Sequence, residues 1–320
     1  MTADRTPQGT GAPDVTSAPD GADAGWRCAG PRWRSAAEPA LLWRHPAHGE
    51  RASPLSTGRL IAFTTRAERG CLGVRRGDRH TPCPVAAPIS PSAVSAQCPD
   101  CARLDRSYSV AADTRTDDRR PYDVYLAWFG PGWIKVGITA TEREGARLLE
   151  QAALSYVLLA RGPLMAARRA EAVLGAALAV PDRFPYAAKR AARQHPTRRE
   201  DRAAELTALH ARAHELAALP ESLRPLTCAP VHHDAAFGLD RIGPSAPHGL
   251  VLLGSHCTVA GHVAAVAGPD VYLCGTDGRP LLLDARHLAG WPLVAADPAA
   301  MTTARIRPAP GTPQEPAALF

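Results

Sequence analysis

The sequence predicts an α+β protein, and three stretches of the 320-residue chain indicate this class. Apolar patterns between residues 122 and 178 follow the order β-β-α-β-α. Short apolar runs that alternate with turns between residues 249 and 294 are typical of a small antiparallel sheet or barrel. A group of cysteines before residue 112 predicts a third unit, which agrees with a length above the roughly 100–150 residues of one usual domain.

The β-β-α-β-α segment begins with β-branched and aromatic runs on both sides of Gly130-Pro131-Gly132, which is typical of a β-hairpin. In chain order, we expect strands at 122–129 and 133–139, a helix at 142–153, a strand at 155–160 and a helix at 164–178. If Phe129 pairs with Trp133, Ala127 lies opposite Lys135. Tyr125 and Lys135 then share one face of the hairpin, and a slip of one residue would separate them.

Composition divides the rest of the chain. The expected segments are a disordered tail at 1–25, a Cys-rich zinc-binding module at 26–112 with one clear strand at 59–64, the core at 121–181, a basic helical segment at 182–225, a small antiparallel β-domain at 248–296 and a tail at 297–320. In the basic segment, Thr197 and Glu200 form a capping-box pattern that predicts the start of a helix ending near Pro220. Its basic residues either follow a nucleic-acid backbone or form a solvated face.

Net charge and the absence of long apolar runs limit the classes of partner. The formal net charge of +6 and the pI near 9.0 favour anionic partners such as nucleic acid. Apolar runs fall short of the ~20 residues that a membrane span needs, so no membrane association is expected. Acidic residues stand where a signal peptide would be basic and then apolar, which predicts a cytoplasmic location.

Four of the eight cysteines fall close together, at Cys71, Cys83, Cys98 and Cys101. Two residues separate the last two, a spacing that lets both thiolates face one Zn²⁺ ion, and four such ligands complete a tetrahedral structural site. The segment carries few apolar residues, so a metal would help it to fold. The alternatives are unligated thiols, a redox-active C-x2-C pair, or His80 in place of one cysteine.

A carboxylate on an apolar helix face gives a second candidate site. Glu171 shares the face of the predicted helix that carries Ala167, Leu174 and Leu178. An ionised carboxylate in apolar surroundings needs a partner, so we expect a bound metal or an arginine beside it. The alternative is a structural ion pair with Arg143, Arg147 or Arg168.

Four features of the predicted core occur in chain order: Val124-Tyr125-Leu126, the KVGIT run from Lys135 to Thr139, an arginine on the first core helix and Glu171 on the second. Together they resemble the GIY-YIG endonuclease core. More closely, the chain resembles an uncharacterised prokaryotic family of unknown function that joins a Cys-rich N-terminal part to such a core. The fragments QCPDC and VYLAWFGPGWIKVGIT carry this resemblance, which covers about residues 60–178 well and 249–294 weakly.

The resemblance implies a catalytic set. Tyr125 would activate water as a phenolate, Arg147, or less favourably Arg143, would contact the phosphate, and Glu171 would hold Mg²⁺ or Mn²⁺. Lys135 stands where active enzymes carry a second tyrosine, and it is either a phosphate contact or a solvated strand residue. The hypotheses are therefore a metal-dependent phosphodiester hydrolase acting on nucleic acid, a non-catalytic zinc-containing nucleic-acid-binding module, or a zinc-stabilised protein-interaction scaffold.

Overall fold

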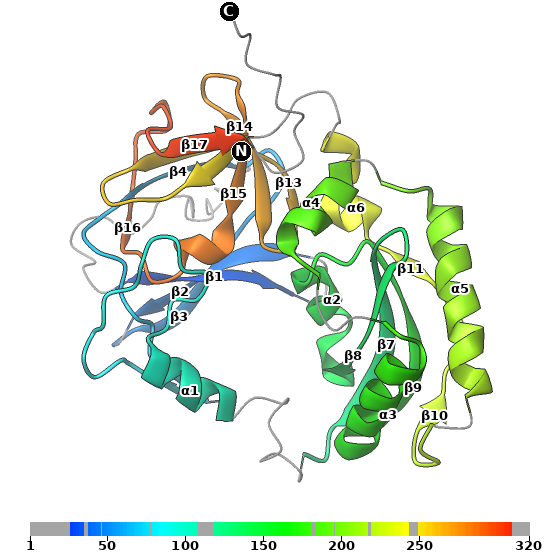
Figure 1. Ribbon diagram of the computed structural model, residues 1–320. Helices are drawn as coiled ribbons and strands as arrows, with labels where there is room; N and C mark the ends of the chain where they lie inside the picture. The colour runs from blue at the N-terminus through cyan, green and yellow to red at the C-terminus, as the bar shows by residue number, and fades with distance from the viewer. Residues whose placement is uncertain are drawn as a thin grey trace, which may run out of the picture.

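The computed structural model describes residues 26–34, 38–45, 47–76, 79–107, 118–180, 184–194, 196–216, 219–242 and 249–308 (Figure 1). The protein is α+β, as expected, with more sheet than helix. The expected tail at 1–25 lies outside the described residues. The expected tail at 297–320 is only partly outside them, because residues 305–308 form a strand in the C-terminal sheet.

The core sheet contains five strands, all paired antiparallel. Its strands are β7 (Pro121–Gly130), β8 (Trp133–Ala140), β9 (Ser155–Pro163) and the short β10 (Arg224–Pro225) and β11 (Val231–His232). Strand β7 lies between β8 and β9, which explains why every residue after Pro121 in it is buried. The expected β-β-α-β-α order is confirmed for this segment.

The register of the β7–β8 hairpin confirms the expected pairing of Ala127 with Lys135. The pairing at the turn differs from the expectation. Trp133 pairs with Gly130 and not with Phe129, and the register shifts between Trp128 and Gly130. A β-bulge adds one residue to one strand, and here this extra residue offsets the different pairing at the turn, so the pairs beyond it, from Trp128 away from the turn, are those expected.

The first core helix is shorter than the expected 142–153. The segment forms a 3-10 turn, η1 (Thr141–Arg143), followed by the short helix α2 (Ala146–Glu150). Glu144 and Gly145 lie between them in the left-handed region, with φ angles of 44° and 80°. A regular α-helix cannot pass through two such residues. The second core helix, α3 (Leu164–Ala177), agrees with its expected range and packs against β7, β8 and β9.

Two further helices follow the core. Helix α4 (Tyr186–Gln194) was not expected, and α5 (Arg199–Glu215) begins two residues after the expected Thr197. The capping box does not form, because the N-cap residue is Arg198 and no side chain caps the helix. Leu206, Leu209 and Ala213 form a buried apolar stripe on α5. It packs against β7 and β9.

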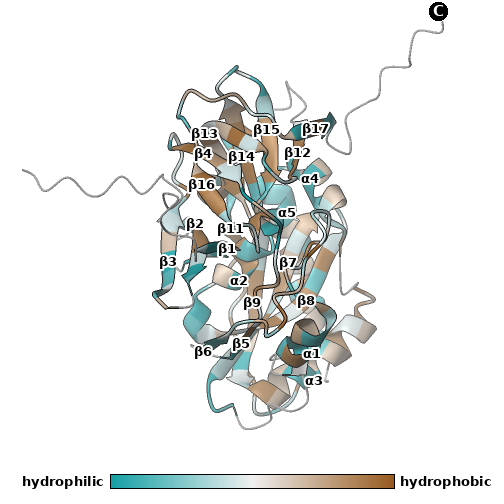
Figure 2. Ribbon diagram, turned by 90° about the vertical axis from the view of Figure 1, so that its left-hand side faces the viewer, coloured by the Kyte–Doolittle hydropathy of each residue, from teal (hydrophilic) through white to brown (hydrophobic). Residues whose placement is uncertain are grey.

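The C-terminal sheet has seven strands in the order β16-β4-β13-β14-β15-β12-β17. These strands are β4 (Leu60–Thr65), β12 (Gly249–Leu252), β13 (Thr258–Ala267), β14 (Asp270–Gly275), β15 (Pro280–Asp284), β16 (Leu293–Ala295) and β17 (Arg305–Pro308). The pair β12–β15 is parallel, so the sheet is mixed. Figure 2 shows apolar residues gathered on β4, β13, β14 and β16. The expected division between residues 26–112 and 248–296 therefore separates strands that are neighbours in one sheet.

The N-terminal region contains more regular structure than the single strand expected there. A three-stranded sheet comprises β1 (Arg27–Trp33), β2 (Pro39–His45) and β3 (Gly49–Pro54). Trp26, Trp33 and Trp43 are buried in it, and Trp33 Nε1 donates a hydrogen bond of 2.8 Å to the carbonyl oxygen of Gly268. Strand β1 contacts η3 (Ala285–Leu288) on one side and α2 on the other. This sheet therefore links the core to the C-terminal sheet.

The remaining elements are the hairpin β5 (Val74–Arg76) and β6 (Arg79–Thr81), helix α1 (Pro99–Ser107), helix α6 (Asp234–Phe237) and the 3-10 turn η2 (Leu239–Arg241). Along the part of the chain described by the structure, no helix has both the length and the apolar character that crossing a bilayer demands.

A buried ionic network joins α4 to the C-terminal sheet. Arg190 Nη2 lies 2.6 Å from Asp270 Oδ1 and 2.7 Å from Asp284 Oδ2. Arg193 also pairs with Asp270, and both arginines are less than 10% exposed. Paired buried charges of this kind are costly to separate. The network therefore fixes α4 on strands β14 and β15.

Candidate functional site

The four residues predicted to form a catalytic set line one cavity of about 460 Å³. Tyr125 comes from β7, Lys135 from β8, Arg147 from α2 and Glu171 from α3. Thr139, Arg143 and Arg168 line the same cavity. We call it the tyrosine cavity. The structure thus brings together four side chains that span 47 positions of the sequence, from residue 125 to residue 171.

A glycine makes room for the phenol ring at the base of this cavity. Tyr125 pairs with Gly137 across the hairpin, and its side chain lies over the Gly137 backbone. A Cβ atom at Gly137 would lie 2.4 Å from Tyr125 Oη and 2.5 Å from Cζ, closer than real Cβ contacts occur. The glycine of the KVGIT run is therefore required by the position of Tyr125.

The hydroxyl group of Tyr125 lies in a nearly dry environment. Tyr125 is 1% exposed, and Gln151 Nε2 donates a hydrogen bond of 2.9 Å to its Oη atom. Burial raises the pKa of Tyr125, while the hydrogen bond from Gln151 and the positive charge of Arg147 act in the opposite direction. Desolvation is the larger effect, so the phenol is neutral at pH 7 in the protein alone.

Behind Gln151 lies a buried lysine. Lys189 Nζ donates a hydrogen bond of 3.1 Å to the backbone carbonyl of Gln151. The same nitrogen lies 3.9 Å from the centroid of the Phe129 ring. Burial lowers the pKa of Lys189 to about 7, and the neighbouring cations Lys135 and Arg193 add to this shift. Lys189 therefore changes charge close to neutral pH. It contacts Gln151, the residue that hydrogen-bonds to Tyr125.

Glu171 faces a cavity dominated by basic groups. Its neighbours on the helix, Ala167 and Leu174, are fully buried, whereas Glu171 is half-buried at the edge of this apolar stripe. Lys135, Arg147 and Arg168 line the cavity with it. One carboxylate among several cations suits both readings made from the sequence, a structural ion pair and a site for a metal ion.

The hydroxyl group of Thr139 is a further polar group in the cavity that could bind a ligand. It is 6% exposed, and within the described ranges its Oγ1 atom has no hydrogen-bond partner. A buried hydroxyl without a partner costs free energy unless water or a ligand satisfies it. Since Thr139 lines the tyrosine cavity, the cavity offers this hydroxyl to whatever occupies it.

The charges of the cavity favour an anion. Arg143 is partly neutralised, because its Nη2 atom lies 2.7 Å from Glu150 Oε1. Lys135, Arg147 and Arg168 line the cavity together with a single carboxylate, that of Glu171. Mg²⁺ is commonly held by one or two carboxylates together with substrate phosphates. Glu171 thus fits a divalent ion only when a phosphate-like ligand completes its coordination.

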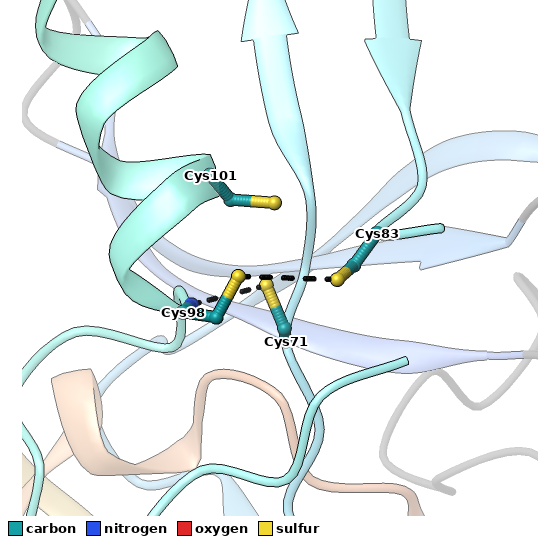
Figure 3. Close-up of side chains that lie close together, drawn as sticks. All are labelled: Cys71, Cys83, Cys98 and Cys101. Atoms are coloured by element: carbon teal, nitrogen blue, oxygen red, sulfur yellow. Dashed lines mark hydrogen bonds between the residues drawn. The ribbon is translucent and has the colours of Figure 1, made fainter. Parts of the chain in front are cut away.

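The four clustered cysteines form a separate candidate metal centre. Their sulfur atoms all lie within 4.8 Å of one another, and they point toward a common centre in Figure 3. The β5–β6 hairpin lies between Cys71 and Cys83, which explains their wide spacing in the sequence, while Cys98 and Cys101 stand at the start of α1. Tetrahedral Zn²⁺ with Zn–S bonds of about 2.3 Å places its sulfurs about 3.8 Å apart. The cluster therefore has dimensions suited to a metal such as zinc.

Backbone donors and burial tune these thiols. The N–H of Cys98 donates to Cys71 Sγ over 3.2 Å, and the N–H of Gly73 donates to the same sulfur over 3.4 Å. Donors from the backbone at Ala87 and Val85 lower the pKa of Cys83 to about 7, whereas burial raises the pKa of Cys101. A thiolate at Cys83 is thus accessible at neutral pH, and a thiolate is the form that binds metal.

His80 does not join the cluster. Its Nε2 atom hydrogen-bonds to the carbonyl oxygen of Leu72, and the group of four close ligand atoms contains only cysteines. The alternative in which His80 replaces one cysteine is therefore not seen. The cysteine thiols are all free in the described structure, which leaves them available as ligands.

The expected basic helical segment, 182–225, contains basic side chains that are buried. Four of its basic residues are less than 10% exposed: Lys189, Arg190, Arg193 and Arg202. These four therefore form neither a nucleic-acid-binding surface nor a solvated face. Arg202 donates a hydrogen bond of 2.6 Å to Asp234 Oδ1. Arg183 lies outside the described residues. The inward basic residues thus bind other parts of the protein, as Arg190 and Arg193 do with Asp270.

Two contributors to the tyrosine cavity were not predicted in the roles they have here. Gln151 stands four positions after Arg147 in the range of the expected first core helix, and Thr139 ends the KVGIT run, but neither was assigned a role. A polar residue next to a buried tyrosine in space leaves no trace in a single sequence. The alternation along β8 does place Lys135, Gly137 and Thr139 on one face, and this was the available signal.

Taken together, the fold and the two sites define an α+β protein with a candidate four-cysteine metal centre and a basic cavity beside a buried tyrosine. The chain belongs to the family described as "Protein of unknown function (DUF2797)", whose model matches residues 58–293, more than half of the chain. The expected membership of an uncharacterised family is thereby confirmed. No curated protein and no solved structure matches the chain.

Proposed function

We propose that this protein acts on nucleic acid as a metal-dependent phosphodiester hydrolase with a GIY-YIG-like core. One observation carries the proposal: Tyr125, Lys135, Arg147 and Glu171, from four different elements, line one cavity. The order β7-β8-α2-β9-α3 around this cavity supports the resemblance of the core to that fold. Catalysis needs such convergence, because reacting groups must be held together before the reaction begins.

In this proposal, Tyr125 Oη accepts the proton of the attacking water. The reactive form is the phenolate, so groups that lower the pKa of Tyr125 assist the reaction. Gln151 donates to Oη, and Arg147 contributes a positive charge. These two groups oppose the desolvation that holds the phenol neutral in the protein alone.

Arg147 and Glu171 act on the phosphate in the same proposal. The guanidinium of Arg147 stabilises the negative charge that develops on the phosphate oxygens. Glu171 is the residue that would hold Mg²⁺ or Mn²⁺, which supplies Lewis-acid chemistry when bound. The unpartnered Thr139 hydroxyl and the ammonium group of Lys135 are further donors for phosphate oxygens in the cavity.

A second candidate function, a non-catalytic nucleic-acid-binding module, is favoured by two observations. Lys135 stands at the position of the second tyrosine of active enzymes, and burial raises the pKa of Tyr125. A cavity that keeps its cations but does not produce a phenolate would bind phosphate without cleaving the ester. In either case the cysteine cluster, loaded with zinc, would stabilise the region around α1.

The two functions are separated by a cleavage and binding screen with labelled DNA and RNA in Mg²⁺ or Mn²⁺. For the hydrolase, Tyr125→Phe and Glu171→Ala should each lower cleavage at least about 100-fold, the usual contribution of an acid–base or metal-binding group. Tyr156→Phe, on β9 outside the cavity, and Glu215→Gln, at the end of α5, are matched controls that keep activity. Binding without cleavage identifies the non-catalytic nucleic-acid-binding module. No binding at any salt concentration would favour the zinc-stabilised protein-interaction scaffold.

A further inference from the structure

A second and larger cavity adjoins the tyrosine cavity. It has a volume of about 930 Å³ and lies between the N-terminal sheet and α2. Arg32 and Arg34 line it from β1 and the residues after it, and Arg51 lines it from β3. Arg143 lines both cavities, so the two are neighbours. We call the larger one the arginine cavity. Figure 1 shows β1 extending toward α2 at this place.

The arginines of this cavity carry charge that the surrounding protein does not neutralise. Arg32 and Arg34 are exposed, and no carboxylate in the described part of the chain forms an ion pair with them. The guanidinium of Arg51 lies over the Trp26 ring at 4.3 Å from its centroid, a contact that orients the group without removing its charge. Its Nε atom is buried and has no hydrogen-bond partner among the described residues.

Two of the three acidic residues in the lining have partners outside the cavity. Glu50 Oε1 lies 2.8 Å from Arg44, and its Oε2 atom lies 3.5 Å from Arg75. Glu142 pairs with Arg120. Glu38 is the third. The arginine cavity therefore has a surplus of positive charge, and it shares Arg143 with the tyrosine cavity.

We propose that the arginine cavity binds the phosphates of a single polynucleotide strand that flank the phosphate held in the tyrosine cavity. The inference rests on the proposed function for the nature of the ligand. A basic groove that follows the backbone is the usual device of proteins that bind single strands. A flexible strand can follow two adjoining hollows. The substrate is then a polymer several nucleotides long, and a dinucleotide would occupy the tyrosine cavity alone.

The test measures binding by fluorescence anisotropy with fluorescein-labelled single strands of 2 and 12 nucleotides. All variants carry Glu171→Gln, so that bound strands stay intact. Arg32→Ala/Arg34→Ala should weaken binding of the 12-mer at least tenfold and leave binding of the 2-mer unchanged. The slope of log K against log salt should fall by about 1.4, from about 0.7 for each lost phosphate contact on a single strand.

A matched control, Arg305→Ala/Arg307→Ala, removes the same charge from exposed positions on β17 and should not change binding of the 12-mer. Arg34→Ala alone, at an exposed position, should show about half of the change in salt slope. Unchanged binding of the 12-mer, or an equal loss for both lengths, overturns the inference.

Cleavage of the 12-mer by the chain with Glu171 intact separates this inference from the proposed hydrolase. If cleavage occurs but the Arg32/Arg34 variant binds the 12-mer normally, the proposed hydrolase is supported and the proposed strand path, through the arginine cavity, is wrong. If that variant loses the 12-mer and no cleavage occurs, the strand path stands without the hydrolase. If neither strand binds at 50 mM salt, both are wrong.

Discussion

The side-chain amide of Gln151 donates a hydrogen bond to the hydroxyl oxygen of Tyr125 over 2.9 Å. Gln151 follows α2 directly, whereas Tyr125 lies in the middle of β7, so the bond ties the end of the short helix to the central strand. Helix α2 also carries Arg147. The position of the phenol and the position of the guanidinium are therefore set by the same helix.

Replacing Gln151 by Leu should raise the pKa of Tyr125 further. Burial already raises it, and the hydrogen bond from Gln151 is one of the groups that oppose this shift. Without the bond, less phenolate forms at a given pH, so the rise of cleavage rate with pH moves to higher pH. The measurement is a pH–rate profile, with Gln194→Leu at the end of α4 as control. A profile that does not move shows that the ionisation of Tyr125 does not limit the rate.

Replacing Gly137 by Ala should destabilise the core and displace Tyr125. The new Cβ atom would lie 2.4 Å from Tyr125 Oη and 2.5 Å from the ring carbon Cζ, and overpacking of this kind costs about 1–3 kcal/mol. Thermal unfolding measures the loss. Gly175→Ala in α3 is the matched control, because no atom lies within 4 Å of the place that its new methyl group would take and alanine favours the helix. Equal melting temperatures for the Gly137 variant and the wild type would contradict the tight contact.

Replacing Lys189 by Met should change how stability depends on pH. The pKa of Lys189 is about 7 in the folded protein and has its ordinary value of 10.5 when unfolded. Between these values the unfolded chain binds more protons, so this group makes the protein more stable as pH rises from about 7 to about 10.5. The slope cannot exceed about 1.4 kcal/mol per pH unit.

The difference between Lys189→Met and wild type isolates this contribution. The variant should be the more stable protein at pH 7, and its advantage should shrink as pH rises. The charged groups that face Lys189 are Lys135, Arg147, Arg193 and Arg286. The contact with the Phe129 ring favours the ammonium form, but this attraction is smaller than the effect of burial and of four like charges. Chemical denaturation at pH 7, 8 and 9 provides the measurement, and a constant difference would contradict the shift.

Removing metal should loosen the cysteine module. We expect one zinc ion per chain by elemental analysis, and chelation should increase hydrogen exchange in α1 and in the β5–β6 hairpin, because metal binding supplies folding free energy there. Cys98→Ser should reproduce the effect of the chelator. Cys274→Ser, at an exposed position on β14, should retain the metal. A protein that contains no metal and shows the same exchange with and without chelator would leave the cluster as free thiols.

Replacing Asp270 by Asn should lower the free energy of unfolding by about 3–5 kcal/mol, since it leaves Arg190 and Arg193 buried without their shared carboxylate. Asp277→Asn removes a carboxylate from a surface pair with Arg279 and should cost less than about 1 kcal/mol. Urea denaturation of both variants gives the comparison. Similar losses would show that the buried network contributes no more than a surface pair.

The core was predictable because its signals are local. The two β-branched runs with Gly130-Pro131-Gly132 between them form the expected hairpin, and Ala127 pairs with Lys135 as expected, although the pair at the turn differs and a bulge lies between Trp128 and Gly130. The four cysteines approach one another as their spacing indicates. In these places, the sequence pattern and the tertiary contacts favour the same structure.

The missed elements depend on distant partners. The buried residues of helix α4 are basic, and the helix is held through Arg190 and Arg193, whose shared carboxylate, Asp270, comes from a strand about 80 positions later. Strands β1 to β3 are rich in Arg and Pro, and Trp33 of β1 donates its hydrogen bond to Gly268, which lies 235 positions later. The break between η1 and α2 depends on the left-handed backbone conformation of Glu144. Glutamate usually favours a helix, so the sequence does not predict a break at this position.

The position of β4 has a consequence for biosynthesis. Thr64 in β4 hydrogen-bonds to Thr258 in β13, a residue that leaves the ribosome 194 positions later. Until then β4 has no neighbours on either edge, and unpaired edges of this kind invite association between nascent chains. Contacts between such distant segments also slow folding. Half-length fragments should therefore aggregate, whereas a piece that spans the family match, residues 58–293, contains both β4 and its partner β13.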